Sequence, residues 1–237
     1  MQPVFYIEKK KLPKCICIEN KINEYLINEE FFGENFMNRY RESNSISVNN
    51  VDNVVSNKTL KGSETEKNLY KTFAGESRAV VKYMLYAEQA KSESYMWLGE
   101  VFDNTALNEL AHARVVAKTF LRIVGITLDN LKDSLTGETN EYENLYKEFQ
   151  ETAEREGFPN IAKFYKELRE VEESHAMVFK DFTDKLEDGT MFEGPVESKW
   201  YCMNCGYIYE GAEAPAVCPL CGYPRGYFKQ YCEITNL

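Results

Sequence analysis

The chain contains only two histidines, and each follows a glutamate by three positions. Glu109 and His112 form the first pair, and Glu172 and His175 form the second. Residues three positions apart lie on one face of a helix, so each pair can present a carboxylate and an imidazole to a common point. Oxygen and imidazole ligands without thiolate favour iron or manganese over copper(I) or zinc. The two pairs therefore predict a redox-active metal centre.

The two pairs belong to a longer internal repeat. They lie 63 positions apart, and Gly75-Glu76 recurs 62 positions later as Gly137-Glu138. One Glu-x-x-His pair on a charged helix is usually a solvated surface feature, but chance explains poorly why both histidines repeat the same pattern. Two facing pairs joined by Glu76 and Glu138 would surround two metal ions, an arrangement known from ferritin-like di-iron and di-manganese proteins.

A second metal site is indicated near the C-terminus by two C-x-x-C motifs that 12 residues separate. The four cysteines are Cys202, Cys205, Cys218 and Cys221. This spacing is typical of two loops that hold one tetrahedral metal ion through four thiolates. Zinc ribbons and rubredoxin-type iron sites share this geometry, so the spacing leaves both metals open.

The surroundings of these cysteines favour iron. The neighbouring ring-containing residues are Trp200, Tyr201, Tyr207, Tyr209, Pro219 and Phe228. An apolar shell excludes water and tunes a redox potential, whereas around structural zinc it would serve only packing. A one-electron carrier next to a redox-active di-metal centre also makes functional sense.

Helices must position the first site. Ser63 and Glu66 have the spacing of a capping box, which predicts that a long helix begins at Ser63. Gly125 is an expected stop, and Gly157 with Pro159 predicts a stop followed by a new start. The expected later helices span residues 95–124, 138–156 and 159–186, with a connection over 129–137. Four amphipathic helices of this kind predict a four-helix bundle.

Composition narrows the function classes. The 237 residues carry a net charge of -10, which argues against nucleic-acid binding because phosphates attract a basic surface. No stretch reaches the ~20 apolar residues of a membrane span, and the lysine cluster at residues 9–11 follows the first apolar run, the reverse of a secretory signal. We therefore expect a soluble, cytoplasmic protein with no nucleic-acid or membrane partner.

The expected domains are an extension over residues 1–59 without an assigned function, a metal-binding helical domain over 60–187, a linker over 188–199 and a four-cysteine domain over 200–237. The extension contains Cys15 and Cys17, and Cys232 follows the four-cysteine motifs. An odd remainder of three cysteines does not resemble a disulfide framework, so we assign these three no role.

From about Leu60 to Tyr231 the chain resembles rubrerythrins. Ala-Gly-Glu-Ser around Glu76 and Gly-Glu-Thr-Asn-Glu-Tyr from Gly137 match the family's di-iron motif, as do the two Glu-x-x-His pairs. The resemblance implies a mainly α fold, with a ferritin-like four-helix bundle and a small rubredoxin-like domain. The implied di-iron ligands are Glu76, Glu109, His112, Glu138, Glu141, Glu172 and His175, and the four cysteines hold one further iron.

The resemblance also implies roles for three residues near the di-iron centre. Glu141, which has no counterpart in the first half, is expected to exchange with His112 as a ligand of one iron when the redox state changes. Tyr83 and Tyr146 are expected to orient ligand carboxylates through their hydroxyls. Either tyrosine could equally be an ordinary core residue.

The implied activity is the reduction of hydrogen peroxide to water by an NADH-linked, non-haem di-iron peroxidase. Electrons would pass from the cysteine-bound iron to the di-iron centre of the partner in a head-to-tail homodimer. A separate reductase drawing on NADH or NADPH, or a rubredoxin, would supply them. Two alternatives stay open: an iron-handling ferroxidase similar to ferritin, and a non-enzymatic redox sensor in which residues 1–59 form the output module.

Overall fold

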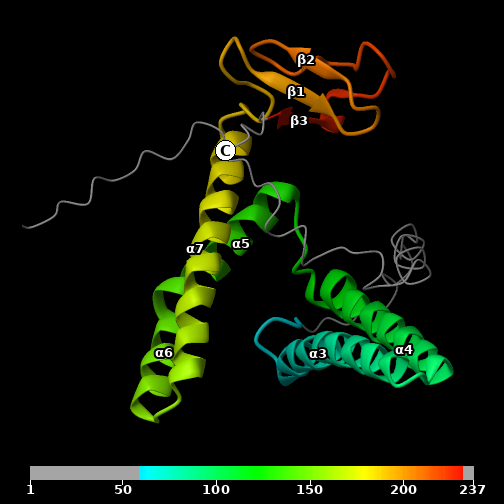
Figure 1. The fold of residues 1–237 in the computed structure, drawn as a ribbon, viewed down its shortest axis with the longest axis vertical. Helices are drawn as coiled ribbons and strands as arrows, with labels where there is room; N and C mark the ends of the chain where they lie inside the picture. Colours follow the sequence, from blue (N-terminus) through cyan, green and yellow to red (C-terminus); the bar gives the residue numbers. More distant parts are fainter. Residues whose placement is uncertain (1–58, 232–237) are drawn as a thin grey trace, which may run out of the picture. The chain divides into compact units, whose positions relative to one another are not determined.

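A computed structural model of the chain describes residues 59–231 (Figure 1). Most of the predicted extension, with Cys15 and Cys17, lies outside the described residues, and so does Cys232. The described part is mainly helical and ends in a small three-stranded domain, which confirms the predicted fold class. The described residues divide into two compact units between Gly125 and Ile126. None of the described helices is long and apolar enough to cross a membrane.

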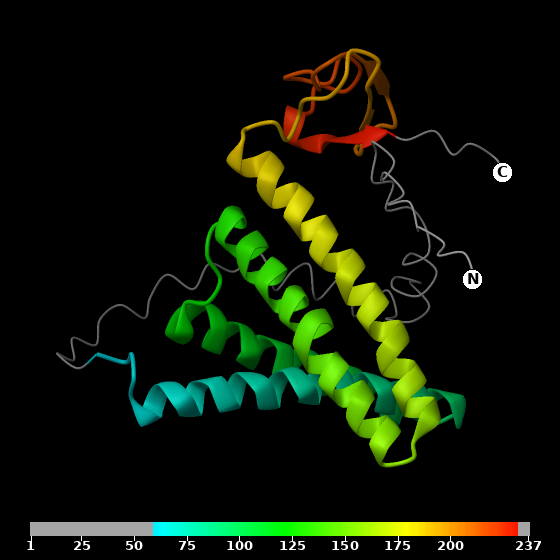
Figure 2. The same cartoon turned by 90° about the vertical axis from the view of Figure 1, so that its left-hand side faces the viewer.

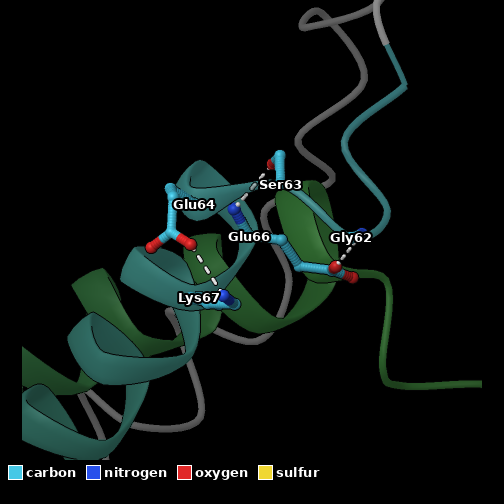
Figure 3. Close-up of polar contacts among 5 residues, drawn as sticks. All are labelled: Gly62, Ser63, Glu64, Glu66 and Lys67. Atoms are coloured by element: carbon cyan, nitrogen blue, oxygen red, sulfur yellow. Dashed lines mark hydrogen bonds and ion pairs between the residues drawn. The ribbon is translucent and has the colours of Figure 1, made fainter.

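The first helix, α3 (Glu64–Ser92), begins as the sequence predicts. Ser63 Oγ accepts a hydrogen bond from the Glu66 N–H at 3.1 Å (Figure 3). The Glu66 carboxylate in turn accepts from the N–H of Gly62 at 2.6 Å, one residue earlier than in a standard capping box. The two bonds satisfy backbone donors at the helix start, so this polar segment fixes where α3 begins.

Helix α3 packs against α4 (Met96–Val115) to form the first hairpin. The residues buried in these helices are all small: Ala87, Ala90, Gly99, Ala106 and Ala113. Small side chains let two helix backbones approach closely, because little volume separates them. The two elements that carry the first metal-ligand candidates are therefore held close to each other.

The end of this hairpin differs from the prediction. A π-helical segment, η1 (Val116–Leu121), follows α4, and the helix stops there rather than near Val124. Arg122 adopts a left-handed conformation with φ of 53°, and the N–H groups of Arg122 and Ile123 both donate to the carbonyl of Ala117. This closure ends the helix before Gly125 is reached.

The second hairpin begins earlier than expected. Helix α5 (Thr127–Asn140) covers the residues 129–137 that we predicted to be a connection, so that prediction was wrong. Leu128, Leu131 and Leu135 recur at helical spacing and are all half-buried, whereas Gly137 lies inside the helix and does not end it.

Helix α5 continues through a π-helical turn, η2 (Glu141–Leu145), into α6 (Tyr146–Arg155). Gly157 adopts φ of 82°, and Pro159 opens α7 (Pro159–Glu187), which confirms the predicted stop and start. Figure 2 shows α7 lying along α5 and α6, which it contacts over much of its length. The second hairpin thus holds Glu138 on one helix and Glu172 with His175 on the other.

The C-terminal domain is an antiparallel sheet with strand order β2-β1-β3. Its strands are β1 (Lys199–Cys202), β2 (Ile208–Glu210) and β3 (Phe228–Tyr231), with a short 3-10 turn over Arg225–Tyr227 before β3. Trp200 on the central strand is only 2% exposed and donates its indole N–H to the carbonyl of Gly211 at 3.0 Å. This tryptophan forms the centre of the small core on which the cysteine loops rest.

Candidate metal centres

The first hairpin brings together one carboxylate from α3 and the Glu-x-x-His pair of α4. His112 Nδ1 lies 2.9 Å from a carboxylate oxygen of Glu109 and 3.5 Å from one of Glu76. One potential ligand atom from each of the three residues lies within 4.8 Å of the others. The structure therefore places Glu76, Glu109 and His112 where a single cation could bind all three.

The second hairpin repeats this geometry. His175 Nδ1 lies 2.8 Å from a carboxylate oxygen of Glu172 and 3.5 Å from one of Glu138. Glu172 is buried, and Oε2 of Glu138 is buried without a hydrogen-bond donor among the described residues. A buried carboxylate oxygen without a donor is costly, and a bound cation would satisfy it. These residues thus fit the oxygen and nitrogen ligand set of a ferrous or ferric ion.

The electrostatics of the clusters agree with this reading. The shared hydrogen bond with Glu109 raises the pKa of Glu76, whereas the same contact and that with His112 lower the pKa of Glu109. Burial, followed by the contact with Glu172, raises the pKa of Glu138. Carboxylates packed this closely repel each other, and a divalent cation removes that repulsion.

The aromatic residues beside the clusters also repeat. In the first hairpin, Tyr83 stacks on Phe102, with ring centroids 6.2 Å apart, and Tyr86 meets Phe102 edge-on at 5.5 Å. The second hairpin has the same arrangement 63 positions later, with Tyr146 stacked on Tyr165 at 5.9 Å and Phe149 edge-on at 5.5 Å. Both tyrosines expected to orient carboxylates thus hold equivalent places in the two hairpins.

Glu141 has a different position from the other candidate ligands. It opens the π-helical turn η2, three residues after Glu138, and its oxygens are not in the three-residue cluster of that hairpin. Its charge nevertheless contributes to the raised pKa of Glu138, and burial together with Glu141 raises the pKa of Tyr146. Glu141 therefore lies outside the cluster but near both Glu138 and Tyr146.

The π-helical turn explains why the repeat has two offsets. The offset is 62 from Glu76 to Glu138 but 63 from Tyr83 to Tyr146, so the second hairpin has one extra residue between these points. A π-helical turn is wider than an α-helical turn and absorbs such an insertion without changing the flanking faces. The change of offset was visible in the sequence, but its meaning as a π-helical turn was missed.

The four cysteines converge as predicted. The Sγ atoms of Cys202 and Cys221 are 3.8 Å apart, and those of Cys205 and Cys218 are 3.7 Å apart. Four sulfurs at about 2.3 Å from a tetrahedral metal lie about 3.8 Å from one another. These separations are far too long for disulfides and suit one four-thiolate metal ion.

The two cysteine loops have the same backbone design. After the second cysteine of each motif comes a glycine with positive φ, 78° at Gly206 and 75° at Gly222. The N–H of each glycine donates to the carbonyl of the first cysteine of its motif, at 2.8 and 3.0 Å. The left-handed glycine turns each chain so that both sulfurs face one point.

The chemistry of the thiols follows from their surroundings. A hydrogen bond from the Tyr223 backbone N–H lowers the pKa of Cys221 to about 6, which favours a thiolate at that position. Despite a backbone hydrogen bond from Tyr207, burial and the other three sulfurs raise the pKa of Cys205 to about 12, and a bound cation would relieve this repulsion between thiolates. Trp200 and Phe228 are buried beside the cysteines and Tyr207 and Tyr209 pack on them, as the predicted apolar shell requires. Pro219 is exposed and takes no part in this core, contrary to the expectation.

Comparison with known proteins links both sites to one family. The rubrerythrin family model matches residues 67–125 and 129–205, and the model of the rubrerythrin rubredoxin-like domain matches residues 200–229. A rubrerythrin from Porphyromonas gingivalis is 39% identical over 185 residues, which cover 73% of this chain and 92% of that protein. A rubrerythrin from Nitratidesulfovibrio vulgaris is 36% identical over 184 residues, covering 73% of this chain and 96% of the relative.

A solved structure of nigerythrin in a partially reduced state is 28% identical and covers 78% of this chain and 96% of its own. Its TM-score of 0.28 is too low to bear on the arrangement of the helices. The sequence matches, in contrast, extend over both the helical and the four-cysteine parts and nearly the full length of the relatives. The chain thus belongs to the rubrerythrin family, as an iron-based oxidoreductase with a di-iron centre and a rubredoxin-type iron centre.

Proposed function

We propose that this protein is a non-haem di-iron peroxidase that reduces hydrogen peroxide to water with electrons relayed through its four-cysteine iron. The observation that carries the proposal is the pair of matching carboxylate and histidine clusters, one in each hairpin. The proposed di-iron ligands are Glu76, Glu109, His112, Glu138, Glu141, Glu172 and His175. The proposed ligands of the single iron are Cys202, Cys205, Cys218 and Cys221.

Each hairpin supplies half of a di-iron ligand set, so we propose that two such halves meet in a four-helix bundle. The four glutamates Glu76, Glu109, Glu138 and Glu172 carry four negative charges when ionised. Two ferrous ions carry four positive charges, so this set neutralises the reduced centre. Glu141 adds one more negative charge, which suits an oxidised centre with higher positive charge.

When bound, the two irons supply the two electrons that cleavage of the O–O bond consumes. The overall reaction takes up two protons and releases two molecules of water. The phenol of Tyr146, whose pKa burial and Glu141 raise, keeps its proton near neutral pH and can hold a ligand carboxylate through it. Tyr83 occupies the equivalent place in the first hairpin and takes the same role.

The four-cysteine iron transfers one electron at a time, so two transfers restore the di-iron centre after each peroxide. We propose that these electrons serve the di-iron centre of the partner subunit in a head-to-tail homodimer. A separate reductase that draws on NADH or NADPH, or a rubredoxin, reduces the four-cysteine iron. The buried Trp200 and Phe228 keep water away from the sulfurs on one side, which supports a redox role.

Anaerobic stopped-flow absorbance tests the peroxidase proposal. Reduced, iron-loaded protein is mixed with hydrogen peroxide, and the return of the ferric-thiolate colour is followed. We expect rapid return of colour in the unchanged protein and a loss of at least ~100-fold in rate for Glu109→Ala, because that change removes a ligand. The matched control is Glu100→Ala, an exposed glutamate on the same helix, which should react at the unchanged rate.

Two results would contradict the proposal. An unchanged rate of reoxidation in Glu109→Ala would show that the carboxylate centre does not reduce peroxide. Accumulation of many irons per chain, with slow turnover in the presence of an electron donor, would point to an iron-handling ferroxidase.

A further inference from the structure

Arg169 on α7 departs from the internal repeat. The residue 63 positions earlier is Ala106, which is fully buried between α3 and α4. Gln150 on α6 departs in the same way, because its counterpart Ala87 is only 1% exposed. Two buried alanines on the packed helices of the first hairpin are thus replaced by an arginine and a glutamine in the second.

Arg169 and Gln150 contact each other. Nη1 of Arg169 donates to Oε1 of Gln150 at 3.2 Å, and Nε of the same guanidinium donates to the backbone carbonyl of Tyr142 at 3.0 Å. Tyr142 is the second residue of the π-helical turn η2. Because a guanidinium presents its N–H groups in a fixed fork, one side chain links α7 to both α6 and η2.

The carbonyl of Tyr142 is not bonded to its usual α-helical donor. In an α-helix it would accept from the N–H four residues later, which is that of Tyr146. Here the Tyr146 N–H donates instead to the carbonyl of Glu141, five residues back, as the wider turn requires. Arg169 supplies a donor in place of the one that the insertion has removed. The Glu141 carbonyl thus accepts from the Tyr146 N–H, and the Tyr142 carbonyl accepts from Nε of Arg169.

We propose that Arg169 is a positioning residue for Glu141: it stabilises the π-helical turn so that Glu141 is presented as the additional carboxylate of the di-iron centre. The first hairpin has no π-helical turn at the equivalent place and no fifth carboxylate, and there the same position is alanine. Among the described residues, the insertion, the extra carboxylate Glu141 and the arginine Arg169 thus occur together in the second hairpin and are all absent from the first. The inference rests on the proposed function, in which Glu141 is a ligand.

Release of iron from the oxidised full-length protein tests this role. The protein is loaded with 57Fe, oxidised and exposed to a chelator, and Mössbauer spectroscopy separates carboxylate-bound iron from cysteine-bound iron. We expect Arg169→Ala to speed loss of the carboxylate-bound iron ~10-fold, the lower end of the effect of removing a residue that orients a ligand. Arg169→Lys, which keeps the charge and one donor group, should restore part of the retention.

The variant Glu141→Ala shows whether Arg169 acts through Glu141. We expect Glu141→Ala alone to speed iron loss by at least ~10-fold, and the double variant to lose iron within ~2-fold of that rate. The control is Arg155→Ala. It removes an arginine of α6 that donates to the Thr152 hydroxyl of the same helix at 2.9 Å, and it should leave iron retention unchanged.

Several outcomes would overturn the inference. These are iron loss at the unchanged rate in Arg169→Ala, the same acceleration in the presence and absence of Glu141, or an equal acceleration by Arg155→Ala. If circular dichroism shows that Arg169→Ala is unfolded, Gln150→Ala takes its place: ~3-fold faster iron loss is expected, and an unchanged rate overturns the inference. Failure of the proposed function has a different signature, because the rate of reoxidation by peroxide would then be unchanged in Glu109→Ala, whatever Arg169→Ala does to iron retention.

Discussion

At the level of single residues, the candidate carboxylate ligands are largely buried and lie close enough to repel one another. The side chain of Glu172 is 11% exposed and that of Glu109 is 20% exposed, and each lies within hydrogen-bond distance of an imidazole. Without a cation, the contact with Glu109 raises the pKa of Glu76 and burial raises that of Glu138, so keeping these two carboxylates ionised costs stability. Binding of metal ions to the folded state removes this cost and stabilises the fold.

A residue-level test of the fold concerns the start of α3. Ser63→Ala removes the oxygen that accepts from the Glu66 N–H, so that donor loses its partner at the helix end. We expect the free energy of unfolding to fall by about 1 kcal/mol, measured by urea denaturation followed by circular dichroism. Ser92→Ala is the control, because Ser92 Oγ only donates to a carbonyl of its own exposed turn. An equal fall in the free energy of unfolding in both variants would show that the Ser63 cap contributes no more to stability than the Ser92 hydrogen bond does.

At the level of elements, the second hairpin is a copy of the first with one residue added. The addition lies in η2, where the backbone bond from Tyr146 to Glu141 spans five residues. Because the extra residue is taken up within one turn, Glu138 and Tyr146 keep the relation that Glu76 and Tyr83 have in the first hairpin. The wider turn thus changes what lies between these residues and leaves the cluster itself intact.

Deletion of one residue tests this reading of η2. Removing Asn144, an exposed residue of the π-helical turn, should convert it to an α-helical turn and leave the protein folded. Removing Lys166, an exposed residue of α7, should instead rotate Glu172 and His175 by about 100° relative to Ala162 and prevent stable folding. Circular dichroism and thermal unfolding distinguish the two deletions. Equal destabilisation would mean that η2 does not absorb an insertion.

At the level of the whole molecule, the proposed relay requires that two different metal centres work in sequence. In the proposed relay, the carboxylate centre would need two electrons per peroxide, and the four-cysteine iron would supply one at a time. Transfer between subunits predicts that a defect in one centre of one chain can be complemented by the other chain of a homodimer.

A hybrid dimer tests transfer between subunits. One chain carries Glu172→Ala, which removes a di-iron ligand, and the other carries Cys221→Ser, which removes a ligand of the single iron. With two different affinity tags, the hybrid can be purified, and we expect about half the peroxidase rate of the unchanged dimer. Each parent homodimer should be nearly inactive. An inactive hybrid would place both steps within one chain.

Much of the site was predictable from local sequence alone. The two Glu-x-x-His pairs, the C-x-x-C motifs and the Ser63 cap depend on spacing within one helix or one loop, and backbone geometry converts such spacing directly into a common face or a common point. The predicted start of α7 at Pro159 held for the same reason. The predicted connection over residues 129–137 was wrong, because Gly137 suggested a helix boundary there. In the structure, half-buried leucines continue α5 through this segment, and α5 packs against α7.

By itself, the sequence determined the types of the candidate metal ligands, their pairing by repeat and the starts of α3 and α7, since these follow from periodicity and side-chain chemistry. Only the tertiary structure showed that the extra residue forms a π-helical turn and that Arg169 donates to its carbonyl from 27 residues away. The Tyr146 N–H can donate to the carbonyl of Glu141 or to that of Tyr142, and the two hydrogen bonds differ little in free energy. The donor that binds the Tyr142 carbonyl comes from the neighbouring helix α7, which no local sequence pattern describes.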